Sequence, residues 1–124
     1  MDDLFSINQL VIDIHNNIST KEQLLNEIDI FTIFIINSIK DITINYENNK
    51  YRKYLLTILE KSKLTLYNFN HRISESLQIT FIELYSFYEI VSNVLNGINV
   101  FIKSSEYKWK YNYRINSENE YIVL

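Results

Sequence analysis

The chain has 124 residues, of which 47% are hydrophobic and 22% are charged, values typical of one globular domain and not of a disordered or fibrous protein. It contains no cysteine, which excludes disulfides, thiolate metal sites and cysteine nucleophiles together. The net charge of −3 gives no bulk attraction for nucleic acid or an anionic membrane, so any such binding requires a local patch.

Two amphipathic helices are predicted over the first third of the chain. The first runs from about Leu4 to Ile18, because its apolar residues recur every three or four positions. The sequence Ser19-Thr20-Lys21-Glu22 is typical of a capping box, in which Ser19 caps the second helix and Glu22 reaches back. The β-branched run 30–36 is also compatible with a buried strand. The predicted inner stripe of this second helix is Leu24, Ile28, Phe31, Ile35, Ile39 and Ile42.

A third helix is predicted after the polar run 45–49, whose asparagines favour a loop. Its predicted inner stripe is Leu55, Leu59, Ser62, Leu66, Phe69 and Ile73. Its outer face is basic and carries Lys50, Arg52, Lys53, Lys61, Lys63 and Arg72.

A fourth helix is predicted to begin at Thr80, where Thr80-Phe81-Ile82-Glu83 forms a second capping box. Ile79 and Leu84 occupy the two positions of a hydrophobic staple around this cap. Asn96-Gly97 is also compatible with a hairpin turn, which would end the helix early. The predicted stripe is Leu84, Tyr88, Val91, Leu95, Ile98 and Ile102, widened by Phe87, Val94 and Phe101.

The last segment changes period, since its apolar residues fall at every second position from Tyr107 to Ile115. This is a strand pattern, and 116–119 can form a turn that lets 121–124 pair back. We therefore expect a four-helix bundle over residues 1–105 and an aromatic C-terminal tail over 106–124 that packs on the bundle or on a partner.

Charge is divided unevenly along the chain. Residues 1–49 hold eight acidic and two basic residues, whereas residues 50–74 hold six basic and one acidic residue. One interpretation is a solvated face of the third helix that complements the first two helices. The other is a binding patch for phosphate, an anionic membrane surface or an acidic partner.

No catalytic or metal-binding motif is present. His15 and His71 are the only histidines, and neither belongs to a helical metal motif with a second histidine. Glu83 and Glu89 do not share a helical face, and a single glycine cannot form a phosphate-binding loop. We therefore expect a protein that is not an enzyme and uses no cofactor and no metal.

The aromatic residues of the tail alternate with cations, which allows three interpretations. They are strand packing, a protein interface rich in tyrosine and tryptophan, and a stacking platform for single-stranded nucleic acid. The predicted partner-binding residues are Lys61, Lys63, Tyr107, Lys108, Trp109, Lys110, Tyr111, Tyr113 and Arg114.

Residues 10–19 followed by a second helix, together with residues 77–83 opening a long helix with Gly97 near its end, resemble the immunity proteins of class II bacteriocins. The resemblance covers helix order and spacing over about 100 residues. It implies a cytosolic antiparallel four-helix bundle with a variable C-terminal tail. It also implies protection of the producing cell by recognition of a toxin-occupied membrane receptor complex, without catalytic residues.

The predicted fold is therefore an all-α, antiparallel four-helix bundle with an extended or hairpin-like C-terminal tail. The predicted function is neutralisation of a toxin by binding, as an immunity protein against a bacteriocin or a contact-delivered toxin. Lack of alanine and proline indicates an A+T-rich genome, so a phage or viral protein that inhibits a host defence factor is an alternative. A small nucleic-acid-binding protein is a third and less favoured one.

The predicted partner is a protein toxin, a toxin–receptor complex or a host defence protein. Wide apolar faces on the second and fourth helices are also compatible with a homodimer. The N-terminus lacks the pattern of a secretory signal, and Asp29, Lys40 and Asp41 interrupt the most apolar segment. We therefore expect a cytoplasmic protein without a transmembrane segment.

Overall fold

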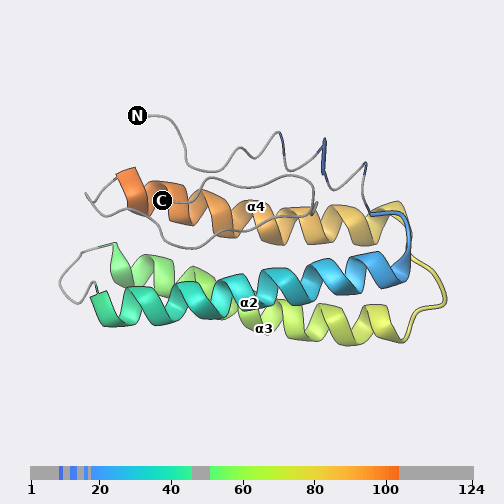
Figure 1. The fold of residues 1–124 in the computed structure, drawn as a ribbon, viewed down its shortest axis with the longest axis horizontal. Helices are drawn as coiled ribbons and strands as arrows, with labels where there is room; N and C mark the ends of the chain where they lie inside the picture. Colours follow the sequence, from blue (N-terminus) through green and yellow to red (C-terminus); the bar gives the residue numbers. More distant parts are fainter. Residues whose placement is uncertain (1–8, 10–11, 14–15, 17, 46–50, 104–124) are drawn as a thin grey trace.

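The computed structural model describes residues 9, 12–13, 16, 18–45 and 51–103. Over these residues it is all-helical and contains the three helices α2 (Lys21–Asn45), α3 (Arg52–Ser74) and α4 (Phe81–Lys103), with no strand. The helices run alternately up and down, and α2 and α4 both contact α3 (Figure 1). The predicted all-α class is thus confirmed for the described residues.

The predicted fourth helix of the bundle, over residues 4–18, is not confirmed. Only four residues of its helical part are described, Gln9, Ile12, Asp13 and Asn16, and these have helical backbone. The side chain of Gln9 donates a hydrogen bond of 3.0 Å to Asp13, one turn further on. The predicted tail 106–124 lies outside the described residues.

Helix α2 begins one residue later than predicted, because Thr20 and not Ser19 is its N-cap. The backbone N–H of Gln23 donates to the Thr20 hydroxyl at 3.1 Å, and the side-chain Oε1 of Gln23 accepts from the Thr20 N–H at 3.1 Å. This is a reciprocal capping box of the same spacing as the predicted Ser19–Glu22 pair. Two overlapping boxes are therefore possible in the sequence. Ile18 precedes both of these boxes, and its side chain is 2% exposed in the core.

The β-branched segment 30–36 is helical, so the strand alternative is wrong. The predicted inner stripe of α2 is buried, with Ile39 partly so, because α2 packs on α3 over most of its length and also contacts α4. Tertiary burial thus overrides the mediocre helix propensity of isoleucine and threonine. A second row of α2 is also buried, since Phe34 is 3% and Ser38 is 0% exposed. The Ser38 hydroxyl donates to the Phe34 carbonyl at 2.8 Å, which satisfies this buried polar group.

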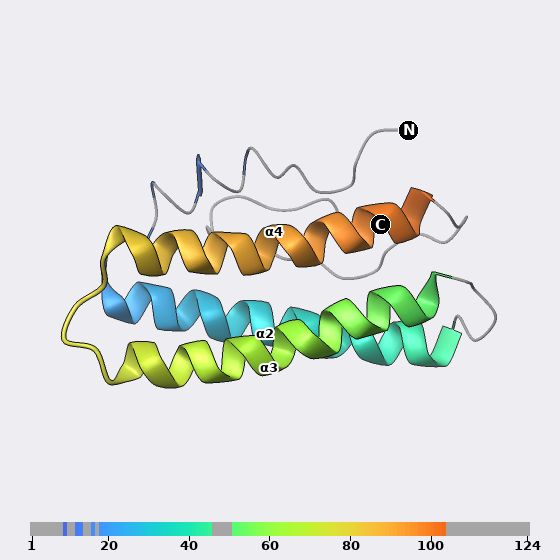
Figure 2. The same ribbon diagram turned by 180° about the vertical axis from the view of Figure 1, so that it is seen from behind.

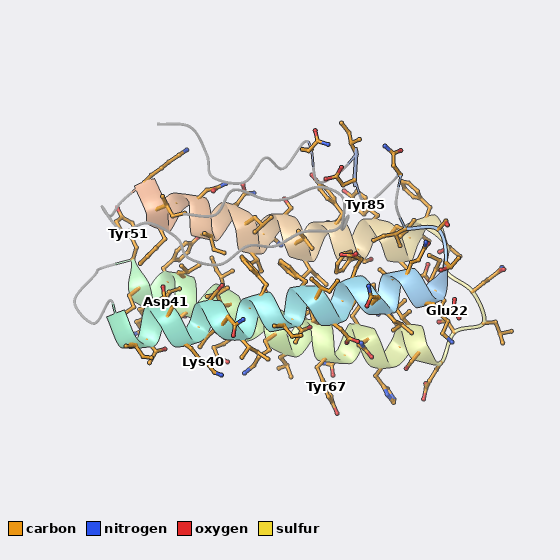
Figure 3. All side chains as sticks on the ribbon, viewed as in Figure 1. Glu22, Lys40, Asp41, Tyr51, Tyr67 and Tyr85 are labelled. Atoms are coloured by element: carbon orange, nitrogen blue, oxygen red, sulfur yellow. The ribbon has the colours of Figure 1, made fainter. Side chains whose placement is uncertain are left out.

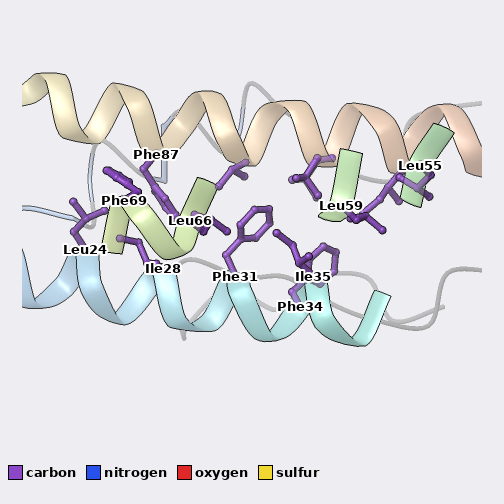
Figure 4. Packing of buried hydrophobic residues seen from close by; sticks show 14 of the residues in the cluster. Leu24, Ile28, Phe31, Phe34, Ile35, Leu55, Leu59, Leu66, Phe69 and Phe87 are labelled. Carbon is purple, nitrogen blue, oxygen red and sulfur yellow. The ribbon is translucent and has the colours of Figure 1, made fainter. Parts of the chain in front are cut away.

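The core lies between the three helices, where the predicted stripes meet (Figure 4). On α3 the predicted stripe is confirmed, with Ser62 only partly buried. At the centre, the ring of Phe31 stacks on Phe34 at 5.7 Å and meets the Phe87 ring edge-on at 6.3 Å. Phe31 therefore joins α2 to α4. The fully buried hydrophobic residues of α4 are Phe87, Val91, Val94, Leu95, Ile98 and Phe101.

Gly97 lies inside α4 and has a negative φ, so the hairpin alternative is wrong. A Cβ atom at this position would lie 3.1 Å from Cδ1 of Ile58 and 3.4 Å from Cδ1 of Leu55, both on α3. The absent side chain therefore lets α3 and α4 approach each other closely at this level.

Side chains cap the start of α4 and the end of α3, whereas Tyr51 makes no side-chain capping hydrogen bond at the start of α3. Thr80 precedes α4 as predicted, and its N–H donates to the Glu83 carboxylate at 2.8 Å. The Thr80 hydroxyl donates to the same carboxylate, and the staple residues Ile79 and Leu84 both pack on the core. At the end of α3, the Lys21 ammonium donates to the carbonyls of Ser74 and Ser76 at 2.8 Å each.

We expect Glu83 to make the stability of the protein depend on pH. The hydrogen bond from the Thr80 hydroxyl lowers the pKa of Glu83 below its ordinary value of 4.5. A carboxyl whose pKa is lowered by folding stabilises the folded state above pH 4.5, and this stabilisation is lost as the pH falls through the folded-state pKa. We expect Glu83→Gln to lower the free energy of unfolding at pH 7. In strong acid, where Glu83 of the parent protein is protonated, the variant and the parent are expected to differ less in their free energy of unfolding. Urea unfolding at both pH values checks this, and a difference that is independent of pH would contradict it.

Candidate protein-binding surface

The solvent side of α3 combines cations with large apolar side chains. We define the α3 outer face as Lys53, Tyr54, Lys61, Leu64 and Tyr67, which are all exposed. Tyr54, Leu64 and Tyr67 expose 57%, 62% and 74% of their surface. Tyr67 points away from the bundle (Figure 3). Exposed tyrosines are common in the energetically dominant part of protein interfaces.

The cations of this face are not neutralised by the neighbouring helix. Within the described part of the chain, neither Lys53 nor Lys61 has a carboxylate within 4 Å of its ammonium group. Two carboxylates of α2, Glu27 and Asp41, are only 6% and 4% exposed and so contribute little to the surface. The exposed Asp29 accepts a hydrogen bond of 3.4 Å from the uncharged Asn70 of α3. The α3 outer face therefore carries two ammonium groups without a carboxylate of the described residues within 4 Å, beside the exposed Glu60, which pairs with Lys63.

The two predicted lysines lie on different sides of α3. Lys63 is 3.4 Å from Glu60 and lines a groove of about 780 Å³ between α2 and α3, together with Tyr67 and His71. Lys61 lines the opposite groove, between α3 and α4. Two positions along a helix correspond to about 200° of rotation, which explains the separation. The structure therefore does not bring Lys61 and Lys63 into one pocket.

The remaining predicted site residues cannot be placed. Tyr107, Lys108, Trp109, Lys110, Tyr111, Tyr113 and Arg114 all lie outside the described residues. Their role in binding stays a prediction.

The groove between α3 and α4 is long and continuous. Two stretches of about 420 and 370 Å³ share Thr65, Ile90 and Asn93 as lining residues, so they form one groove. It extends from Tyr54 at one end to Arg72 at the other. Figure 2 shows α3 and α4 side by side on this face of the molecule. We name it the α3–α4 groove.

Arg72 is held at the far end of this groove by a ring. Its guanidinium lies 5.1 Å from the centre of the Phe69 ring, a cation–π arrangement. Its charge also contributes to the lowered pKa of Glu83. Arg72 is exposed and makes no ion pair within 4 Å in the described part of the chain.

A second exposed cluster was missed by the sequence analysis. Leu77, Phe81, Ile82 and Tyr85 lie in the α3–α4 connection and the first turn of α4, and Leu77 is fully exposed. The rings of Phe81 and Tyr85 stack at 6.4 Å. The sequence contains one signal for this cluster, since none of these large apolar residues belongs to the predicted stripe of α4. Apolar clusters of this kind often mark interaction sites.

The described residues offer few candidates for a catalytic or metal-binding site. His71 is exposed, with its Nε2 3.4 Å from Glu75, and His15 lies outside the described residues. In the described ranges, no group of three or more histidine, aspartate or glutamate side chains is arranged to hold a metal ion.

Comparison of the chain with protein-family models, curated proteins and solved structures gives no significant match. The resemblance to bacteriocin immunity proteins therefore stays a prediction from helix order and capping. None of the described helices has an apolar stretch long enough to cross a bilayer.

Proposed function

We propose that this chain is a non-catalytic binding protein that neutralises a toxin, in the manner of an immunity protein, by binding an acidic protein surface. One observation carries the proposal. The α3 outer face presents the free ammonium groups of Lys53 and Lys61 among the exposed side chains of Tyr54, Leu64 and Tyr67.

Exposed aromatic and apolar side chains beside free ammonium groups suit contact with an acidic protein surface. The exposed tyrosines supply apolar contact area with a polar group at the tip, and tyrosine is enriched among the residues that dominate binding energy at protein interfaces. The unneutralised lysines accelerate association with an acidic partner and select against basic ones. The small size of the chain and the resemblance of its helix order to immunity proteins support the neutralising role.

Charge reversal on the α3 outer face tests the proposal. The tagged chain is expressed in its native cells, and the captured protein is identified by mass spectrometry and purified for calorimetry. We expect one dominant acidic partner, a toxin or a toxin–receptor complex, whose affinity falls by at least about tenfold with Lys61→Glu, because an attraction becomes a repulsion. Lys40→Glu makes the same change of charge on the exposed surface of α2 and serves as the control.

Two results would contradict the proposal. The first is a partner whose affinity is the same for the parent chain and for the double variant Lys53→Glu/Lys61→Glu. The second is a captured nucleic acid whose affinity falls linearly with salt on a logarithmic plot. A host defence protein as the partner would instead support the inhibitor alternative with the same binding face.

A further inference from the structure

The walls of the α3–α4 groove are rich in side chains that can form hydrogen bonds but have no partner within the described chain. They come from both helices. Asn68 contributes a carboxamide from α3, and Asn93 and Asn96 contribute two more from α4. None of the three makes a hydrogen bond with another residue of the described ranges, and all are exposed. The floor is apolar and includes Ile58, Ile90 and the buried Gly97.

Such carboxamides match the main chain of an extended peptide. Each offers a C=O acceptor beside an N–H donor, as does one backbone residue that has no partner strand. The lining residues of α3 extend from Tyr54 to Arg72, which corresponds to about 27 Å of helix. At about 3.3 Å per residue, an extended segment of roughly eight residues would fill the groove.

The charges of the groove add a preference for acidic side chains. Lys61 and Arg72 lie on the α3 wall, neither forms an ion pair in the described part of the chain, and Glu89 is the single carboxylate among the lining residues. Lys61 and Arg72 are separated by eleven positions, about 16 Å along the helix. The side chains of an extended peptide alternate between its two sides, so two acidic residues four or six positions apart can both face these cations.

We propose that the α3–α4 groove binds an extended, acidic segment of the partner protein. The carboxamides hold the main chain of that segment, and Lys61 and Arg72 select two carboxylates four or six positions apart, on the same side of the extended chain. This inference rests on the proposed function, because it names the part of the partner that the binding protein recognises.

Other occupants fit the groove less well. A docked amphipathic helix needs a broad apolar groove, whereas both walls here carry hydroxyl and carboxamide groups. Single-stranded nucleic acid needs successive aromatic rings for its bases, and Tyr54 is the only exposed aromatic side chain among the described residues that line the groove.

Selection of peptides by the full chain tests the inference. A phage-displayed library of random dodecapeptides is selected on the immobilised protein, and the enriched peptides are synthesised for fluorescence anisotropy. We expect peptides with two acidic residues four or six positions apart and without a helical apolar pattern. Their affinity is expected to fall by at least about tenfold with Lys61→Glu, with Arg72→Glu, or with Asn93→Ala combined with Asn96→Ala.

Lys63→Glu is the matched control, because it makes the same change of charge two positions away, on the α2 side of α3. Circular dichroism of each variant confirms that the helices are retained. Peptides without acidic residues, peptides with a helical apolar pattern, or tighter binding of a thymidine dodecamer would overturn the inference. Equal losses with Lys61→Glu and Lys63→Glu would also overturn it, because Lys63 does not line this groove. The proposed function has its own test, and it fails if the double variant Lys53→Glu/Lys61→Glu leaves the affinity of the natural partner unchanged. The two failures are therefore distinguishable.

Discussion

Phe31→Ala is expected to lower the free energy of unfolding by about 3–5 kcal/mol, because it removes a fully buried ring and leaves a cavity. Phe31 lies between Phe34 and Phe87, so the variant also loses one stacked and one edge-on ring contact. The total stability of a domain of this size is about 5–15 kcal/mol, so a large part of it depends on this one side chain. Urea unfolding followed by circular dichroism measures the loss.

Ile33→Ala provides the matched control on the same helix. Ile33 lies two positions away and is 58% exposed, so its truncation is expected to change the free energy of unfolding by less than about 0.5 kcal/mol. Similar losses for Phe31→Ala and Ile33→Ala would show that α2 does not bury the face described above.

Gly97→Leu is expected to destabilise the protein by about 2 kcal/mol, since the new side chain has to push α3 and α4 apart. Even a Cβ atom would lie 3.1 Å from Ile58, and a leucine adds three further carbon atoms in the same direction. Overpacking of this kind costs roughly 1–3 kcal/mol. The higher helix propensity of leucine offsets up to about 1 kcal/mol of the strain. Thermal and urea unfolding of the variant test this expectation.

The neighbouring position separates packing from propensity. Asn96 is exposed, so Asn96→Leu gains helix propensity without meeting α3, and we expect its stability to be equal to or slightly above that of the parent. A Gly97→Leu variant as stable as Asn96→Leu would show that the two helices are not in close contact at this level.

The candidate site was only partly predictable from the sequence. The basic character of the third helix is a property of its composition, and Lys61 was selected on that basis. The separation of Lys61 from Lys63 into different grooves depends on which helices lie on either side of α3, and composition does not contain that information. The groove carboxamides Asn68 and Asn93 are 25 positions apart in the sequence, so only the antiparallel packing of α3 and α4 brings them to one groove.

The sequence by itself determined those features that depend on neighbouring residues. The start of α4 at Thr80 follows from hydrogen bonds within four positions, and the buried stripes of α2, α3 and α4 follow from helical periodicity. Where the sequence was compatible with two local structures, only the tertiary structure decided between them. Segment 30–36 is a helix that buries Phe31, Phe34 and Ile35 in the core between the helices. Gly97 continues α4 in close contact with α3. Local energies differ by only a few tenths of a kcal/mol per residue in such cases, whereas burial of one large side chain contributes about 2 kcal/mol.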